Sequence, residues 1–327
     1  MASQLLITGG VLDIGDQSIL CRFPSPCLVL STSAYNGGYL LADAVFNQRL
    51  GLFVDSEGDL PGGSLENYLA AVAAEHGLNR ERSTGLLTSA RMECRGYSAI
   101  TFRDTVVEVV ATAGVNENAA RAGDFACYYE DPDCYQPLGG TINLLAFTNI
   151  SLPRGAMAKA LLSITEAKAA ALQELAVVSP STLNPATGTG TDGVILACDP
   201  AANVACRDAG TQSKLGELFC RATKAAVKQS LARECQIDPR RQGSAAERLR
   251  RLELQEINGD GLFEEPRANV LLAMSQAVWQ EYRWGLLGLD ELYHFLALLD
   301  VLELQPFGAR LSSGLRRRMA AAVSDEP

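Results

Sequence analysis

The chain has 327 residues, of which 47% are hydrophobic and 20% are charged, and its net charge is -10. This length suits one large globular domain, or a domain with an extension. The negative charge argues against a nucleic-acid partner, whose phosphates attract a basic surface, and slightly favours a cationic ligand. No stretch approaches the roughly 18 apolar residues of a membrane helix, and the N-terminus shows no basic and apolar leader. We therefore expect a cytoplasmic protein with no membrane partner.

The nine cysteines and two histidines limit the chemistry that is available. The cysteines form no Cys-x-x-Cys pair and are scattered, which is typical of reduced thiols rather than of a disulfide framework. His76 and His294 lie far apart in the sequence, so neither a histidine-based zinc site nor a Ser-His-Asp triad is favoured. A catalytic Cys-His pair stays open as a less common alternative. We predict no protein-bound metal and no cofactor.

The N-terminal part alternates short apolar runs with turn residues. Three strands are expected, at Leu5–Thr8, Ser18–Phe23 and Cys27–Thr32, with turns at Gly9-Gly10 and Pro24-Ser25-Pro26. A turn rich in glycine and hydroxyl groups follows at residues 31–38, and a helix is expected from about Tyr39 to Leu50. The N–H groups at the start of such a helix would suit an anion. The glycine spacings of nucleotide-binding loops are missing.

Stronger local signals follow. Leu65–His76 is predicted to be a helix capped by Ser64. Strands are predicted at residues 85–90 and 105–112, and the second is rich in β-branched side chains. Residues 124–138 are predicted to form a loop.

Segments rich in Gly, Thr and Asn recur at strand ends, at residues 85–90, 111–116, 139–143 and 186–192. One such segment is ordinary turn chemistry. Four of them suggest a shared rim, where small and hydroxyl side chains leave room for a bulky ligand. The last one ends in Asp192 and leads into a short apolar run that is predicted to be a buried strand. A carboxylate at that point is costly to bury unless a partner accompanies it.

A helix is predicted from about Arg154 to Val178, and it carries a lysine on its apolar stripe. The apolar members of that stripe are Leu161, Ile164, Leu172 and Leu175. Lys168 falls in the middle of them, so its ammonium group must reach solvent, lose its charge or find a carboxylate. The sharper hypothesis is a pair with Asp192 or with Glu166 at the rim.

The C-terminal part changes in composition after a further amphipathic helix at Ser213–Cys235. Residues 239–244 look like a linker, and Leu-rich helices are expected at about 245–257, 267–281 and 289–303. We therefore predict a domain at residues 1–238 and a helical extension at 239–327, which would cap the site or form a subunit interface. The fold class is α/β in the α+β sense: a mixed or largely antiparallel sheet packed with helices, plus an all-α extension. The opening strands come too close together for parallel crossovers.

With these motifs in order, the chain resembles the adenosylcobinamide amidohydrolase (CbiZ) family over roughly residues 5–230. The matching pieces are Asn36-Gly37-Gly38 with Asn47 beyond it, Gly85-Leu86-Leu87-Thr88-Ser89-Ala90, Ala111-Thr112-Ala113-Gly114-Val115, Gly140-Thr141-Ile142-Asn143, Thr165-Glu166-Ala167-Lys168, Ala186-Thr187-Gly188-Thr189-Gly190-Thr191-Asp192 and Ala209-Gly210-Thr211-Gln212-Ser213-Lys214-Leu215-Gly216-Glu217. Each piece is weakly specific alone, and their shared order makes the resemblance strong. Gln212 stands where the family usually shows a histidine, and an amide cannot carry a titrating proton.

The resemblance implies hydrolysis of the amide that joins an aminopropanol arm to the corrin ring of adenosylcobinamide, as a step of corrinoid salvage. For this reaction the sequence offers Asp192 or Glu166 as a base and Lys168 as a proton donor or charge stabiliser. Thr141, Asn143 and Thr189 are expected to donate hydrogen bonds. The expected substrate-binding residues are Asn36, Gly37, Gly38, Asn47, Thr88, Thr112, Gly114, Gly188, Thr189, Gly190, Thr191 and Gln212. The partner is then a corrinoid small molecule that brings its own cobalt.

Several alternatives stay open at this point. The nucleophile is water or a threonine hydroxyl. The chain is an enzyme, or a corrinoid-binding protein that has lost the chemistry, as Gln212 would allow. A synthase or transferase that holds phosphate in its glycine-rich segments would need a nucleotide motif, and the sequence has none of the standard ones. A homo-oligomer is possible.

Overall fold

A computed structural model of the protein describes residues 2–51, 54, 57–116, 118–126, 141–182, 184–242 and 278–295. The chain divides into two compact units, Met1–Asp238 and Pro239–Pro327. In the second unit, the short helix α4 (Pro239–Gln242) occupies part of the predicted linker, and residues 278–283 and 289–295 are helical. The predicted helix at 245–257 and most of the other two C-terminal helices lie outside the described residues. Within the described ranges, no helix is long and apolar enough to cross a bilayer.

The first unit is built on one mixed sheet of nine strands. In the order β1-β2-β3-β11-β9-β7-β6 neighbours are hydrogen-bonded, and β4 pairs with both β3 and β5. The strands are β1 (Ala2–Leu5), β2 (Val11–Ile14), β3 (Ser18–Ser31), β4 (Gly38–Arg49), β5 (Ser83–Thr88), β6 (Gly96–Phe102), β7 (Thr105–Ala113), β9 (Ile142–Thr148) and β11 (Gly193–Cys198). Among these nine described strands, only the pairs β4/β5 and β9/β11 are parallel. The predicted fold class, a mixed and largely antiparallel sheet packed with helices, is confirmed.

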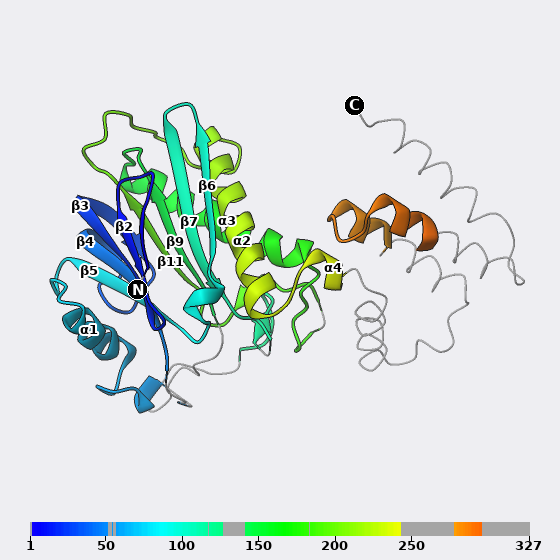
Figure 1. Ribbon diagram of the computed structural model, residues 1–327, viewed down its shortest axis with the longest axis horizontal. Coiled ribbons are helices and arrows are strands. Elements are labelled where there is room, and N and C mark those ends of the chain that lie inside the picture. The colour runs from blue at the N-terminus through cyan, green and yellow to red at the C-terminus, as the bar shows by residue number, and fades with distance from the viewer. Residues whose placement is uncertain are drawn as a thin grey trace, which may run out of the picture. The chain divides into compact units, whose positions relative to one another are not determined.

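The sheet curls so that its two halves face each other around a shared core. That core joins Ile19 and Val45 of one half to Val110, Leu145 and Ile195 of the other. Helices α2 (Arg154–Glu174) and α3 (Lys214–Glu234) cover the outer face of the β6-β7-β9-β11 half, and α1 (Leu65–Glu75) covers the outer face of the β3-β4-β5 half (Figure 1). Two sheet layers therefore lie between two helical layers.

The helix predicted at Tyr39–Leu50 is wrong, because the segment is strand β4. Ala44 and Phe46 pack against α1, while Val45 faces the opposite way into the core between the sheet halves. A strand that is buried on both faces loses the alternation of apolar and polar residues that identifies strands. Since no helix begins after the turn at 31–38, the anion site predicted there does not form.

Strand β3 is continuous where two short strands were predicted. It runs through Pro24 and Pro26, with a register shift against β4 between Arg22 and Cys27. Its first half pairs with β2 and its second half with β11, so the prolines sit where the partner changes. A missing N–H breaks no ladder at such a point.

The first predicted strand, at Leu5–Thr8, is displaced: β1 ends at Leu5, and the chain turns at residues 6–10 into β2. Strand β6, which the sequence analysis did not predict, lies at the edge of the sheet with its alternation blurred by partial exposure. The three long helices agree with the prediction to within a few residues. Ser64 caps α1 by accepting from the Asn67 N–H at 3.2 Å.

Candidate active site

Parallel pairing of β9 and β11 brings two of the Gly/Thr segments together. Asn143 lies opposite Gly193, so the two strands begin at the same end of the sheet. The other two segments reach the same place, because Thr112 lies opposite Asn143 and the Leu87 carbonyl accepts from Asn143 Nδ2 at 2.8 Å. Residues 139 and 140 lie outside the described residues. The remaining parts of the four segments meet at one end of the sheet, as predicted.

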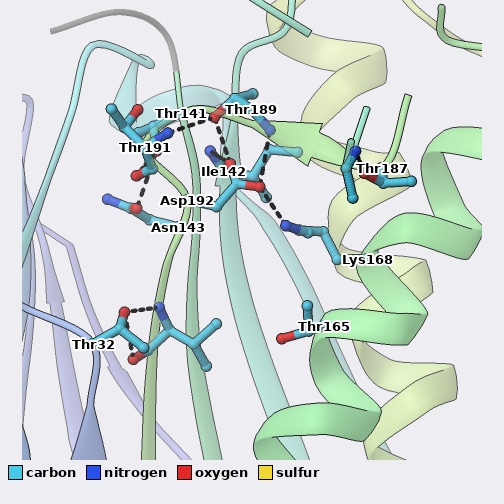
Figure 2. Close-up of polar contacts among 12 residues, drawn as sticks. Thr32, Thr141, Ile142, Asn143, Thr165, Lys168, Thr187, Thr189, Thr191 and Asp192 are labelled. Atoms are coloured by element: carbon cyan, nitrogen blue, oxygen red, sulfur yellow. Dashed lines mark hydrogen bonds and ion pairs between the residues drawn. The ribbon is translucent and has the colours of Figure 1, made fainter. Parts of the chain in front are cut away.

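Both carboxylate oxygens of Asp192 are held by donors (Figure 2). Oδ2 pairs with the Lys168 ammonium group of α2 and accepts from the Thr189 N–H at 3.0 Å. Oδ1 accepts from the Thr189 hydroxyl at 2.6 Å and from the Ile142 N–H at 3.0 Å. The side chains of Lys168 and Asp192 are only 10% and 12% exposed. The predicted pairing of these two residues is confirmed.

The glycines of the 186–192 turn have different tasks. A Cβ at Gly188 would lie 2.3 Å from Asp192 Oδ2 and 2.6 Å from Lys168 Nζ, so only glycine leaves room for the ion pair. A Cβ at Gly190 would meet no heavy atom within 4 Å. Gly188 and Thr189 also form the short strand β10, which pairs with β8 (Ala119–Ala120). The turn is thus fixed from the α2 side and from the β8 side.

A cavity of about 380 Å³ opens beside this turn. Its polar wall includes Thr88, Asn143, Thr191 and Asp192, and its apolar wall includes Leu50, Leu65 and Leu69. The apolar wall has no signal in the sequence, because leucines on an amphipathic helix are normally core residues. Asp192 reaches the cavity, and Lys168 contacts that carboxylate from the α2 side. The arrangement places a buried ion pair at the edge of a pocket that is half apolar.

The three predicted hydrogen-bond donors are already engaged with the protein. The Thr189 hydroxyl donates to Asp192, and the Thr141 hydroxyl donates to the Thr191 carbonyl at 2.6 Å. Asn143 Nδ2 donates to the Leu87 carbonyl and to Asn47 Oδ1 at 2.7 Å. The prediction that they donate to a substrate is therefore not supported by this arrangement. Their hydroxyl and amide groups instead hold the turn and the strands around the cavity together.

The polar wall of the cavity is supported by a second layer of residues, Asn47, Thr112 and Gly114. Asn47 Nδ2 donates to Thr112 Oγ1 at 2.9 Å, and both side chains are buried. The Gly114 N–H donates to the Thr141 carbonyl at 3.1 Å. These residues lie close to the site, but they contact Asn143 and Thr141 and are not among the residues that line the cavity, so their part in substrate binding stays a prediction.

Asn36, Gly37 and Gly38 shape a turn and do not line the cavity. Asn36 and Gly38 have positive φ angles of 52° and 83°. A Cβ at Gly37 would lie 2.2 Å from the Ser33 carbonyl oxygen. The turn presents Ser33 to the cavity, where its hydroxyl also donates to the Gly85 carbonyl at 2.5 Å. Their part in substrate binding stays a prediction.

Glu166 is not at the site. It is exposed on α2. Its charge adds to burial in raising the pKa of Cys220 on α3, and the Cys220 thiol contacts the Ser163 carbonyl of α2, one turn before Glu166. The structure therefore offers Asp192, and not Glu166, as the carboxylate of the cavity.

Gln212 is also remote from the site. It is exposed and precedes α3, whose first residue, Lys214, lies with Nζ 4.8 Å from the centroid of the Phe102 ring. Phe102 pairs with Thr105 at the start of β7, and β7 reaches the site only at its other end. Gln212 thus lies at the opposite end of the sheet from Asp192. Its predicted contact with the same substrate group is not supported.

Neither a metal site nor a reactive thiol emerges from the described residues. They contain no group of three His, Cys, Asp or Glu side chains that could hold a metal ion. Burial raises the pKa of Cys198 to about 11 and that of Cys27 to about 12, so both thiols are protonated near neutral pH. No cysteine is among the described residues that line the cavity.

The family model of adenosylcobinamide amidohydrolases matches residues 8–239. The chain belongs to this family. The matched range contains the cavity, the Lys168–Asp192 pair and all the segments that carry the resemblance. Membership makes the protein an amidohydrolase, an enzyme that cleaves a carbon–nitrogen amide bond.

One relative is an uncharacterized protein of Methanocaldococcus jannaschii, MJ1613, which is 33% identical over 186 residues. The match covers 53% of this chain and 71% of that protein. Because that protein is uncharacterized, the match gives no information on the substrate.

Among solved structures, the PH0078 protein from Pyrococcus horikoshii OT3 is 11% identical with a TM-score of 0.33, covering 71% of this chain and 81% of its own. A Burkholderia sp. β-aminopeptidase is 12% identical with a TM-score of 0.32, covering 67% and 78%. An L-aminopeptidase D-Ala-esterase/amidase from Ochrobactrum anthropi is 10% identical with a TM-score of 0.33, covering 68% and 82%. Likeness at this level of identity and TM-score says nothing about the residues or the mechanism of this amidohydrolase.

Proposed function

We propose that this amidohydrolase hydrolyses the amide between the aminopropanol arm and the corrin ring of adenosylcobinamide. One water is consumed: its hydroxyl goes to the carbonyl carbon, and a proton goes to the departing nitrogen. The products are adenosylcobyric acid and aminopropanol. The observation that supports this substrate is the family match over residues 8–239. In the cell, the reaction would serve corrinoid salvage in the cytoplasm.

The size of the cavity fits the arm of this substrate. About 380 Å³ is near the lower end of the roughly 300–1,000 Å³ typical of small-molecule sites. A corrin ring with its amide side chains is much larger than the ligands of such a site. We therefore place the aminopropanol arm in the cavity and the ring outside it. The net charge of -10 favours the positively charged cobalt-corrin core weakly.

We assign the charged chemistry to Asp192 and Lys168. Asp192 lines the cavity, and its donors hold it in one place, so no reorganisation is needed when a reacting group arrives. Lys168 pairs with Asp192 Oδ2 at the edge of the cavity, and we assign its positive charge to stabilising the negative charge that develops on the carbonyl oxygen. Within a half-apolar cavity such a charge acts more strongly than it would in water.

The proposal is tested by incubating the purified protein with adenosylcobinamide in water labelled with oxygen-18. The expected result is a corrinoid carboxylate that carries one labelled oxygen, together with free aminopropanol, both detected by mass spectrometry. Asp192→Asn should remove this activity, and Asp208→Asn, which changes an exposed aspartate of another Lys–Asp pair, should retain it. Binding of the corrinoid without any new carboxylate would instead support a corrinoid-binding protein without chemistry.

A further inference from the structure

The amide group of Asn143 has only one possible orientation. Its Nδ2 lies 2.8 Å from the Leu87 carbonyl oxygen, which can only accept a hydrogen bond. The same nitrogen gives its second hydrogen to Asn47 Oδ1 at 2.7 Å. Asn47 is fixed in turn, because only its oxygen can accept that hydrogen, which leaves its Nδ2 to donate to Thr112 Oγ1 at 2.9 Å. Chemistry therefore determines which atom of Asn143 is the nitrogen and which is the oxygen.

This orientation points the Asn143 oxygen away from Leu87 and leaves it weakly engaged. Its one hydrogen-bond contact among the described residues is with Thr141 Oγ1 at 3.5 Å, and the Thr141 hydroxyl already donates to the Thr191 carbonyl at 2.6 Å. A side chain at Gly193 would crowd this oxygen, since a Cβ there would lie 2.9 Å from Oδ1 and 2.7 Å from Leu86 Cδ2. Asn143 and Gly193 both line the cavity.

A buried acceptor with spare capacity selects a ligand that donates. Asn143 is only 2% exposed, so a ligand that fills the cavity without a donor would leave Oδ1 without a full hydrogen bond. The scissile amide of the proposed substrate offers an N–H, whereas an ester of the same shape offers an oxygen with no hydrogen. We propose that Asn143 Oδ1 accepts the N–H of the scissile amide and restricts the enzyme to amides that carry an N–H, with Asn47 as its positioning residue. This inference rests on the proposed function.

The test compares adenosylcobinamide with an analogue whose arm is joined by an ester in place of the amide. The readout is the ratio of kcat/KM for the amide to kcat/KM for the ester. Asn143→Leu keeps the shape of the side chain but removes the acceptor, so the ratio should fall at least about tenfold, as expected for the loss of one buried hydrogen bond. A merely structural role would lower both rates alike and leave the ratio unchanged.

Asn149 provides a matched control at the other end of the same strand. It follows β9, and its amide is used in a similar way, with Oδ1 accepting from the Val106 N–H and Nδ2 donating to the Asp104 carbonyl, both at 2.8 Å. Asn149→Leu should leave the ratio at the wild-type value. An equal fall in both variants would overturn the assignment to Asn143.

Two variants at Asn47 test its positioning role. In Asn47→Asp, the new carboxylate can still accept from Asn143, and the Thr112 hydroxyl can donate to it. Asn47→Leu offers no acceptor, so Asn143 loses one of its two anchors. The ratio should fall in Asn47→Leu and be largely restored in Asn47→Asp. The same low ratio in both variants would contradict the positioning role.

A last measurement needs only the wild-type protein, so it does not depend on variants that fold. N-(2-hydroxypropyl)propanamide and its ester counterpart are compared as competitive inhibitors of adenosylcobinamide hydrolysis. The amide should inhibit at least about tenfold more strongly, on the same hydrogen-bond argument. Equal inhibition would overturn this inference and leave the proposed function standing. A wild-type protein that hydrolyses neither substrate would instead overturn the proposed function.

Discussion

Helix α2 carries two Lys–Asp pairs that have the same chemistry and opposite surroundings. Lys168 pairs with Asp192, and the two side chains are 10% and 12% exposed. Lys159 pairs with Asp208 at 3.0 Å, and those side chains are 59% and 54% exposed. Asp192 ends a glycine-containing turn and Asp208 precedes one, and both aspartates also accept hydrogen bonds from backbone N–H groups. Burial, rather than residue type, separates the two pairs.

The difference in burial changes how much each pair contributes to stability. An exposed pair is screened by water and salt, and the stabilisation it gives is small because two long side chains must be ordered to form it. A buried pair is costly to desolvate, and it is kept only where the surrounding donors compensate or where the charges have a task. Asp192 has such donors from Thr189 and Ile142, and it faces the cavity. The Lys159–Asp208 pair therefore serves as an internal control for every test of the buried one.

The largest expected effect is on turnover. Lys168→Met and Asp192→Asn should each lower turnover at least about a hundredfold, the scale of losing a positioned acid, base or charge stabiliser. The double variant should be far from additive, because the two groups act as one unit. Lys159→Met and Asp208→Asn should leave turnover near the wild-type value.

Single-turnover rates and thermal unfolding on the same samples decide between two interpretations of this pair. If it only anchors α2 to the sheet, the folded fraction of each variant should turn over at a near-normal rate. A normal rate in a folded Asp192→Asn protein would remove Asp192 from the catalytic machinery.

The second effect is on stability. Lys168→Met leaves the buried carboxylate of Asp192 without its cation, which typically costs about 3–5 kcal/mol. Urea unfolding should show a loss of free energy of unfolding on this scale for Lys168→Met and no comparable loss for Lys159→Met. Similar values for the two variants would mean that the buried pair is better solvated than its exposure indicates.

A third effect comes from the glycines of the turn. Gly188→Ala should push Lys168 and Asp192 apart, since its Cβ would lie within 2.6 Å of both charged groups. We expect a stability loss of about 1–3 kcal/mol, typical of overpacking, and a fall in turnover. Gly190→Ala is the matched control, because its Cβ meets nothing within 4 Å, and its stability should stay at the wild-type value. Calorimetry of both variants checks this contrast.

The contrast between the pairs also shows what could be predicted from the sequence. The position of Lys168 on an apolar stripe and the cost of burying Asp192 predicted a carboxylate partner for Lys168, either Asp192 or Glu166, because both arguments are local. Helices α1, α2 and α3 follow in the same way from periodicity and caps.

Features that depend on distant partners could not be predicted. The residues that engage the amide of Asn143, Leu87 and Asn47, lie 56 and 96 positions away in the sequence. Strand β4 was missed because its two faces pack against different layers, which no local pattern records. Glu166 and Gln212 were placed at the site because of their motifs. Glu166 lies instead on an exposed face of α2, and Gln212 lies at the end of the sheet where α3 begins near Phe102.

The smallest expected effect concerns the exposed pair at low pH. The hydrogen bond from Lys159, followed by the backbone N–H of Gly210, lowers the pKa of Asp208 from its ordinary value of 3.8. A carboxyl whose pKa is lowered by folding stabilises the protein above the unfolded value and loses that contribution as the pH falls through the folded one. The melting temperatures of wild type and Asp208→Asn should therefore differ slightly near neutral pH and converge well below pH 3.8. Because both side chains are more than half exposed, about 1 M salt should also shrink the difference. A large difference that resists salt would show that the exposed pair contributes as a buried one does, and the contrast drawn between the two pairs would then fail.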